Sequence, residues 1–283
     1  MKMNNKEVAK LATKALLYEV SISPKAGLVS RLSNGSHKDM DFYTFIDSAL
    51  SLNNYFSECF VYGQENDFYS SSFFKNLRDL GKKAEREMYQ ATNGINTHKG
   101  TIFSMGIIIS VLASYLKEVD KIDLKILSEK IKTMCIPLLE ELENTNNFST
   151  YGEKAFKNYH LTGARGLAIS GYDIVLLNGI CKLKEFTKIL DFETSCILLL
   201  FYYISILDDT NIVSRADFET LKEIQILCKN LYEENSKSLS KEKIRNEMSK
   251  LNDIFIEKNI SAGGSADLLI LTIFIYFILK LII

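Results

Sequence analysis

Two loops of this sequence repeat the same order of residue types and have the composition of an anion site. Residues 34–38 read Asn-Gly-Ser-His-Lys, and residues 93–100 read Asn-Gly-Ile-Asn-Thr-His-Lys-Gly. Each loop precedes a segment with helical periodicity, and backbone N–H groups at the start of a helix attract anions. We therefore expect the two helix starts to hold one polyphosphate from two sides. The residues of this hypothesis are Lys25, Ser36, His37, Lys38, Asn96, His98 and Lys99.

Helix capping without any ligand is the alternative explanation for these loops. Asp41 stands where an N-cap residue belongs, with a threonine three residues later. Capping does not explain why Lys25, His37 and Lys38 crowd into one loop. Two of the three histidines of the chain occupy matching places in the two loops, whereas the third, His160, has no comparable context. These observations favour the anion site over capping alone.

A third segment, residues 162–166, reads Thr-Gly-Ala-Arg-Gly. Glycines on both sides of Arg165 let the backbone approach a ligand, and the guanidinium can form two parallel hydrogen bonds with a phosphate. A surface arginine at a helix start is the alternative. Arg215, which follows the acidic segment described next, is a further candidate cation.

The fourth segment contains two adjacent carboxylates, Asp208 and Asp209, after an apolar helical stretch over residues 192–207. At the C-terminal end of a helix each carboxylate opposes the helix dipole, which costs roughly 0.3–1 kcal/mol. A bound cation would reverse this cost, and the run Asp-Asp-Thr-Asn offers the oxygen ligands that Mg²⁺ prefers. The pattern therefore predicts a Mg²⁺ ligand at Asp209, with a solvated turn as the alternative.

The fifth segment, residues 261–267, reads Ser-Ala-Gly-Gly-Ser-Ala-Asp and opens the last apolar helix. Ser265 can cap this helix, and Asp267 in its first turn interacts favourably with the dipole. The functional interpretation has Gly263, Gly264 and Ser265 bind phosphate while Asp267 holds a metal ion. A bare carboxylate there would repel phosphate, so the two interpretations differ in whether a metal is present.

The elements that must position these segments are helices, and the sequence predicts an all-α fold. Strict alternation is nearly absent, and apolar residues recur at spacings of three and four, as in Leu221, Ile224, Leu227, Cys228 and Leu231. With only two prolines, long helices are rarely interrupted. The expected helices cover residues 5–20, 41–60, 69–91, 98–117, 123–143, 150–159, 165–181, 191–207, 215–235, 240–257 and 265–282.

Two stretches, residues 102–116 and 192–207, are apolar on nearly every face, so we expect them at the centre of the fold. No repeat and no low-complexity linker divides the chain. We therefore expect a single globular domain of about ten to twelve helices over residues 1–283, in line with usual domain sizes. The apolar run 268–279 is shorter than the roughly 18–20 residues that span a bilayer. It is therefore expected to be a buried core helix and not a membrane anchor.

Composition excludes several other classes of function. The formal net charge of −1 provides no basic excess, so nucleic acid is not expected as a partner. The five cysteines show no CxxC pair and lie in or beside apolar stretches, as expected for free thiols in a reducing compartment. Residues 1–10 are polar and lack the apolar region of a signal peptide, so a cytoplasmic protein is expected.

Taken in order, six segments resemble the triphosphoribosyl-dephospho-CoA synthases, which serve citrate lyase and, in a sister branch, malonate decarboxylase. Each motif alone is moderately specific, whereas six in the same order are a strong signal. Ala26 stands where the family is expected to carry proline. Leu167 stands where relatives commonly carry glutamate, so we assign no role to Leu167. The matching segments are residues 19–29, 34–41, 93–100 with Phe103-Ser104, 163–166, 209–215 and 263–269.

The resemblance implies a glycosyl transfer between ATP and 3′-dephospho-CoA. The 2′-hydroxyl of dephospho-CoA would attack the anomeric carbon of the ATP ribose, and adenine would leave. The product, 2′-(5″-triphosphoribosyl)-3′-dephospho-CoA, is the precursor of an acyl-carrier-protein prosthetic group and would pass to an acyl-carrier-protein transferase. The resemblance also implies Mg²⁺ for the triphosphate.

This chemistry needs a base for the hydroxyl, a carboxylate beside the developing oxocarbenium ion, and cations for the triphosphate. The candidate catalytic acids are Asp39, Asp41, Asp209 and Asp267, and the sequence does not decide which of them is the base. Asp209 and Asp267 are also the candidate Mg²⁺ ligands. The candidate phosphate and nucleotide contacts are Lys25, Ser36, His37, Lys38, Asn96, His98, Lys99, Arg165, Arg215, Gly263, Gly264 and Ser265.

Two alternatives remain, one from the same class of function and one from another. A helical Mg²⁺-dependent ADP-ribosyl hydrolase also cleaves a ribosyl bond, carries a similar Asp-Asp-Thr element, and differs in using water as the acceptor. A non-catalytic helical protein with a membrane-attached C-terminus is the other alternative. The sequence leaves open the oligomeric state and the choice between citrate lyase and malonate decarboxylase.

Overall fold

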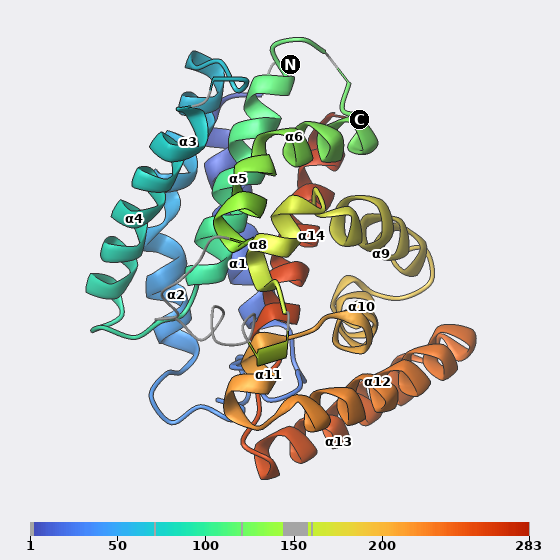
Figure 1. Cartoon of the computed structure of the whole chain (residues 1–283). Helices are drawn as coiled ribbons and strands as arrows, with labels where there is room; N and C mark the ends of the chain where they lie inside the picture. The colour runs from blue at the N-terminus through green and yellow to red at the C-terminus, as the bar shows by residue number, and fades with distance from the viewer. Residues whose placement is uncertain (1–2, 71, 120, 144–157, 160, 283) are drawn as a thin grey trace.

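The computed structural model describes residues 3–282 except for residues 71, 120, 144–157 and 160. Across these residues the chain forms helices and no β-strand, which confirms the all-α prediction (Figure 1). The expected helix 150–159 falls almost wholly outside the described residues. The helices are α1 (Asn5–Ser21), α2 (Phe42–Ser51), α3 (Asn53–Glu65), α4 (Phe73–Ala91), α5 (Lys99–Tyr115), α6 (Leu124–Glu143), α8 (Gly163–Ile169), the π-helix η1 (Ile174–Gly179), α9 (Ile180–Phe186), α10 (Phe192–Ile206), α11 (Thr210–Arg215), α12 (Phe218–Ser238), α13 (Lys241–Glu257) and α14 (Gly263–Ile282).

The structure differs from the expected helices in three places. The segment 41–60 is two helices, because the chain turns at the buried Leu52 between α2 and α3. The segment 165–181 is also broken, because Gly171 and Tyr172 both take left-handed backbone angles (φ 67° and 53°) between α8 and η1. The short helix α11 was not expected, and its N-cap is Asp209. The last two corrections both change the environment of the predicted site.

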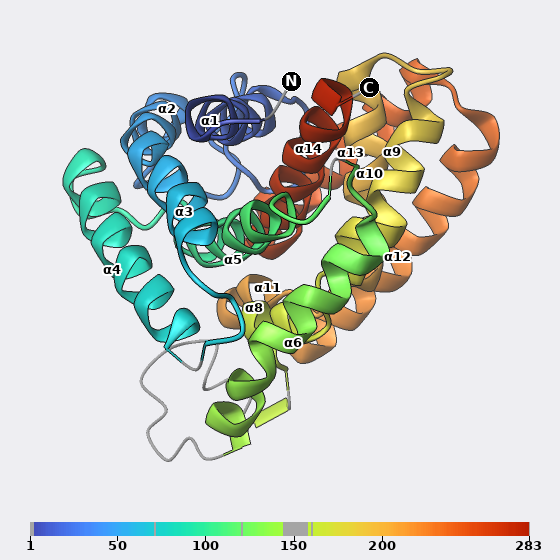
Figure 2. The ribbon, with the colours of Figure 1, turned by 90° about the horizontal axis from the view of Figure 1, so that it is seen from above.

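The two apolar stretches are central helices, as predicted. From Thr101 to Tyr115, α5 is buried except at Phe103, and from Thr194 to Ile204, α10 is buried except at Tyr202. Helix α3 packs closely on α5 because Gly63 has no side chain, and a Cβ there would overlap the backbone of α5. Figure 2 shows α1, α3 and α4 on one side of α5, and α6 on the other. The core cluster is continuous, so it holds all of these helices in fixed positions.

The last helix, α14, is longer than the apolar run read from the sequence. It extends over 20 residues and is long and apolar enough to cross a membrane by length and composition. In the structure it packs against α1, α5 and α10, and its residues from Leu268 to Ile275 are at most 2% exposed. These contacts agree with a core helix, and they fix the position of Asp267 at its start.

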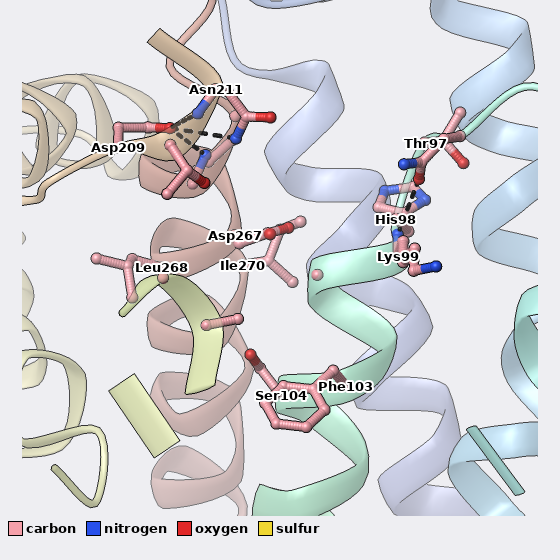
Figure 3. A pocket seen from close by; sticks show the side chains of 18 of the residues that line it. Thr97, His98, Lys99, Phe103, Ser104, Asp209, Asn211, Asp267, Leu268 and Ile270 are labelled. Atoms are coloured by element: carbon pink, nitrogen blue, oxygen red, sulfur yellow. Dashed lines mark hydrogen bonds between the residues drawn. The ribbon is translucent and has the colours of Figure 1, made fainter. Parts of the chain in front are cut away.

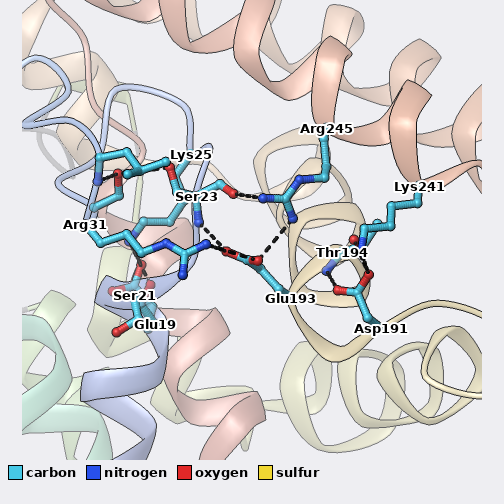
Figure 4. Close-up of polar contacts among 12 residues, drawn as sticks. Glu19, Ser21, Ser23, Lys25, Arg31, Asp191, Glu193, Thr194, Lys241 and Arg245 are labelled. Carbon is cyan, nitrogen blue, oxygen red and sulfur yellow. Dashed lines mark hydrogen bonds and ion pairs between the residues drawn. The ribbon is translucent and has the colours of Figure 1, made fainter.

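A long loop, residues 22–41, is fastened to the other helices by one carboxylate, Glu193 of α10 (Figure 4). Glu193 Oε1 accepts hydrogen bonds from the Ser23 N–H and from Arg31, both at 3.0 Å. Glu193 Oε2 pairs with Arg245 at 3.1 Å, and Arg245 also donates to the Ser23 carbonyl at 2.8 Å. Gly27, at φ 64°, donates its N–H to the Asn252 side chain at 3.0 Å. The loop is therefore held by α10 and α13 and presents a defined surface to the interior.

Candidate active site

The loop 22–41 and several helices enclose a cavity of about 870 Å³. The starts of α5, α8, α11 and α14 all contribute to its wall, together with one face of α4 and the end of α6. Helix starts carry partial positive charge, so their convergence favours an anionic ligand. Most of the predicted site residues line this cavity, namely Lys25, His37, Asn96, His98, Lys99, Arg165, Asp209, Arg215, Gly263, Gly264 and Asp267.

Five predicted residues do not belong to the cavity wall. Lys38 and Asp39 are exposed on the surface of the loop. Asp41 is the exposed N-cap of α2 and forms a capping box with Thr44, which confirms the capping alternative for it. The other two, Ser36 and Ser265, donate their hydroxyl protons to the Phe255 carbonyl and to Asp209. Lys38 and Ser36 of the first loop therefore do not contribute to the predicted polyphosphate site of the two loops, which is called the two-loop clamp below.

Asp267 lines the cavity from the second turn of α14 and faces the start of α5 (Figure 3). The Thr101 hydroxyl donates a hydrogen bond to its Oδ1. Its Oδ2 occupies the space beside Gly100, where a Cβ would overlap it. Burial raises the pKa of Asp267 to about 7, the carboxylates of Asp209 and Glu19 add to this rise, and the Thr101 hydrogen bond opposes it. Asp267 is therefore a group that exchanges a proton near neutral pH.

Asp209 serves a different purpose, because its oxygens already have partners. Oδ1 accepts from the Asn211 N–H at 3.0 Å, the Asn211 amide at 3.1 Å and the Gly264 N–H at 3.3 Å. Oδ2 accepts from the N–H and the hydroxyl of Ser265, at 3.0 and 3.3 Å. Burial raises the pKa of Asp209, and these hydrogen bonds oppose the rise. The carboxylate thus joins the starts of α11 and α14 and occupies the place that phosphate was expected to take at Gly264 and Ser265.

This geometry removes the argument for Asp209 as a metal ligand. Asp209 is the N-cap of α11, where the helix dipole favours a negative charge, so the prediction that it opposes a dipole is wrong. Its two oxygens accept five hydrogen bonds and leave little room for a cation. Asp208 lies on the surface and pairs with Lys222 at 2.9 Å. The described residues contain no cluster of three or more acidic, histidine or cysteine side chains that fits a metal ion.

The two histidines of the predicted clamp contribute hydrogen bonds and not charge. Burial lowers the pKa of His37 to about 4, with Arg215 adding to the effect and Asp39 opposing it. Arg215 donates to His37 Nδ1 at 3.1 Å, so the proton of the neutral ring is on Nε2, which donates to the Ser261 hydroxyl at 3.0 Å. His37 therefore fixes Arg215 in the cavity wall. The expected positive charge on His37 is absent near neutral pH.

His98 has a ring nitrogen available for a ligand, although only 1% of the residue's surface is accessible. Burial lowers its pKa to about 3, and Lys25 adds to the effect. Its Nδ1 bonds the Ser48 hydroxyl at 2.7 Å, and Ser48 in turn accepts a hydrogen bond from Thr97 at 2.7 Å. His98 lines the cavity, and Nε2 is the ring nitrogen that the described residues leave without a hydrogen bond (Figure 3).

Lys25 is buried in an ion pair with Glu19, a residue that was not among the predicted site residues (Figure 4). The Lys25 ammonium lies 2.5 Å from Glu19 Oε1 and 3.0 Å from the Glu19 carbonyl. Burial raises the pKa of Glu19 and lowers that of Lys25, and the attraction between them opposes both changes. The pair lines the same cavity as Asp267 and His98, whose pKa values it shifts. The sequence did contain a signal for this ion pair, because Glu19 is the first residue of the matching segment 19–29.

A second group that sequence reasoning missed is one face of α4. Arg78, Lys82, Glu85 and Tyr89 line the cavity at spacings of four, three and four residues, which is one stripe of a helix. Lys99 lies beside this stripe and forms an ion pair with Glu85 at 3.0 Å. The adjacent face of α4 is buried in the core, so its sequence looks like that of any amphipathic surface helix. No spacing signal distinguishes a stripe that faces a cavity from one that faces solvent.

Fold and cavity together define a class of protein: a helical enzyme that binds anionic nucleotides around a carboxylate with a pKa near neutrality. The cavity wall carries the cations Arg165 and Arg215, the start of α5, and an unpaired imidazole nitrogen. Apolar side chains of the loop 22–41 and of α5, α6 and α8 complete the wall. Such a mixture fits a ligand with charged groups attached to flat or apolar ones.

The particular family follows from comparison with known proteins. A family model described as ATP:dephospho-CoA triphosphoribosyl transferase matches residues 5–282, and the chain belongs to this family. Two curated relatives are the probable 2-(5″-triphosphoribosyl)-3′-dephosphocoenzyme-A synthases of Streptococcus pyogenes serotype M49 (strain NZ131) and serotype M5 (strain Manfredo). Each is 37% identical over 292 residues, with 97% of both chains covered. No solved structure shows significant similarity.

Family membership confirms the predicted transferase that uses ATP and dephospho-CoA. It argues against the two alternatives, the hydrolase and the non-catalytic membrane-attached protein. The roles of the individual site residues, the need for Mg²⁺, the cytoplasmic location and the single domain over residues 1–283 stay predictions.

Proposed function

We propose that this cavity joins the triphosphoribosyl group of ATP to the 2′-hydroxyl of 3′-dephospho-CoA and releases adenine. A C–O bond forms at the anomeric carbon of the ATP ribose, and the C–N bond to adenine breaks. The hydroxyl loses one proton and adenine gains one, so the reaction is balanced. Family membership supports this reaction, and the position and raised pKa of Asp267 are the observations that support this site.

Asp267 is our candidate for the base and for the stabilising carboxylate. A carboxylate with a pKa of about 7 is a stronger base than an ordinary aspartate and is ionised in a large fraction of molecules at neutral pH. Its negative charge also stabilises the oxocarbenium ion that develops as adenine leaves. The other carboxylates are less suited, since Asp39 and Asp41 are exposed and Asp209 is fully hydrogen-bonded.

ATP is proposed to lie between the loop 22–41 and the starts of α8 and α11. The apolar side chains of Leu28, Val29 and Phe45 line this part of the cavity, which suits adenine. The ring of His98 packs edge-to-face with Phe45, with the ring centroids 5.0 Å apart, and its unpaired Nε2 would bond the base or the ribose. Arg165 and Arg215, which line the same cavity, are the proposed triphosphate ligands.

Mg²⁺ is proposed to enter with the triphosphate and not to be held by the protein. The five hydrogen bonds that the Asp209 carboxylate accepts support this assignment, because they occupy the oxygens that would hold the ion. The predicted role of Asp209 as a metal ligand therefore does not fit the described geometry, whereas that of Asp267 stays a prediction. No step of the reaction is assigned to the metal.

The product is proposed to pass to an acyl-carrier-protein transferase in the cytoplasm. Citrate lyase is the proposed final acceptor, and malonate decarboxylase is the alternative. The two destinations are distinguished by mass spectrometry of the acyl-carrier proteins in cells with and without this enzyme.

Adenine release is the experiment that tests the reaction. Purified protein is incubated with MgATP and dephospho-CoA, and adenine and the coupled product are quantified by chromatography. We expect one adenine for each product molecule and no ADP, with no adenine when dephospho-CoA is omitted. Adenine formed without dephospho-CoA would indicate hydrolysis, and stoichiometric ADP would indicate a kinase.

A further inference from the structure

The face of α4 that lines the cavity has no assigned role in the reaction as described above. Arg78, Lys82, Glu85 and Tyr89 form a stripe about 16 Å long, at the 1.5 Å rise of an α-helix. Charged residues line its first part, and Tyr89 ends it near the start of α5. A stripe of this length exceeds what one phosphate group needs, so it is matched to an extended ligand.

The charged part of the stripe lies at the cavity edge, where the start of α4 and the end of α6 come together (Figure 2). Arg78 uses only its Nη2 to pair with Glu141 of α6, at 2.8 and 2.7 Å from the two carboxylate oxygens. The Arg78 guanidinium also packs over the Phe74 ring, 4.9 Å from the ring centroid. This contact fixes the orientation of the guanidinium plane. One turn along, Lys82 contacts the exposed Asp79 at 3.4 Å, which is its one ion pair among the described residues. Both cations therefore have donors to offer a phosphate.

Beyond these cations the cavity wall becomes apolar. Tyr89 of α4, Phe103 of α5, Leu138 of α6 and Leu167 of α8 all line it. Leu138 lies three residues before Glu141, so both are on the same face of α6, and Phe103 lies one turn after Lys99 on α5. The sequence of surfaces from the edge inward is thus cationic and then apolar, and it leads to Asp267.

We propose that this stripe is the subsite for dephospho-CoA, with Arg78 and Lys82 binding its diphosphate and the apolar wall holding its adenosine. The inference rests on the proposed function, because it places the acceptor of that reaction. In dephospho-CoA the diphosphate joins the adenosine to the pantetheine arm. An adenosine on the apolar wall therefore carries its ribose towards Asp267, while the arm extends from the cations out of the cavity. ATP has a compact triphosphate and no arm, so it fits the opposite end with Arg165 and Arg215. The arrangement brings the two ribose groups together at Asp267.

Kinetics of two variants and two matched controls test the assignment. Arg78→Gln and Lys82→Gln are each expected to raise the KM for dephospho-CoA about 10-fold or more, as for loss of a charge-assisted hydrogen bond. The KM for ATP should stay within about 2-fold by the same argument. Arg86→Gln and Lys75→Gln remove the same charges from exposed positions of α4 that do not line the cavity, and should change neither KM.

A fragment of the acceptor gives an independent measurement. Pantetheine 4′-phosphate carries one phosphate and the arm, so it should inhibit competitively against dephospho-CoA and not against ATP. Its inhibition constant should rise in Lys82→Gln by a factor similar to the KM for dephospho-CoA. A selective rise in the KM for ATP, or no change in either KM, would overturn the proposal. Failure of the wild-type enzyme to release adenine would overturn the proposed function instead, so the two failures are distinguishable.

Discussion

The charge of Asp267 is expected to lower the stability of the folded protein, and replacing it with asparagine removes that charge while keeping the shape. Burial raises the pKa of Asp267 from an ordinary value near 3.8 to about 7. A group whose pKa is raised by folding stabilises the protein below the unfolded pKa, and this contribution is lost as the pH rises to the folded pKa. The free energy of unfolding of the wild type should therefore fall between about pH 4 and pH 7 because of this residue.

The magnitude follows from the size of the pKa change. A rise of about three units at about 1.4 kcal/mol per unit corresponds to about 4 kcal/mol. Asp267 is partly accessible from the cavity, and water there reduces the effect to about 2–4 kcal/mol. In Asp267→Asn the new side-chain amide faces Gly100 without an acceptor, which costs about 1–3 kcal/mol. That cost is the same at every pH, so the comparison between two pH values isolates the charge.

Urea unfolding of both proteins at pH 4 and pH 8 measures this contribution. Asp267→Asn should gain about 2–4 kcal/mol relative to the wild type on going from the lower to the higher pH. The wild type and Thr101→Val, which keeps the carboxylate but loses its hydrogen bond, should both lose stability over the same interval. Parallel pH dependence of the wild type and Asp267→Asn would refute the raised pKa and the reasoning built on it.

Three further changes follow from the cavity wall. Gly100→Ala places a Cβ against Asp267 Oδ2, so we expect kcat to fall at least about 10-fold with little change in Tm; an unchanged kcat would show that the carboxylate can move without consequence. Asp209→Asn leaves the N–H of Ser265 facing an amide donor, so it should lower the free energy of unfolding by about 2 kcal/mol in urea, whereas a raised Tm would contradict the capping role. Arg215→Gln should raise the KM for ATP about 10-fold, while Lys38→Ala, on the loop surface, should leave it unchanged. The reverse result would support the two-loop clamp as the phosphate site instead.

The helices could largely be predicted from the sequence because each follows a local apolar period. The central positions of α5 and α10 followed from stretches that are apolar on every side. The breaks at Leu52 and Gly171 could not be predicted, because neither position carries a proline and a lone glycine is tolerated within a helix. Left-handed angles at Tyr172 arise from packing, which the sequence does not display.

Most residues of the candidate site could be predicted from the sequence, but the contacts between them could not. The segments around His98, Asp209 and Asp267 were recognised from motif order, and the structure brings them to one cavity. Asp209 was misjudged because its partners, Gly264 and Ser265, lie more than 50 residues away in the chain. The neutral state of His98 depends on burial, which no local pattern reveals.

The rate of adenine release as a function of pH tests the central claim most directly. If Asp267 is the base, kcat/KM of the wild type should rise with pH and level off above about pH 7, where the carboxylate is ionised. Asp267→Asn should be slower by about 10²- to 10⁴-fold and should lose this pH dependence. The dissociation constant for ATP, measured by calorimetry, should change little in the variant. An Asp267→Asn enzyme with a near wild-type rate, or with the same rise near pH 7, would contradict the account.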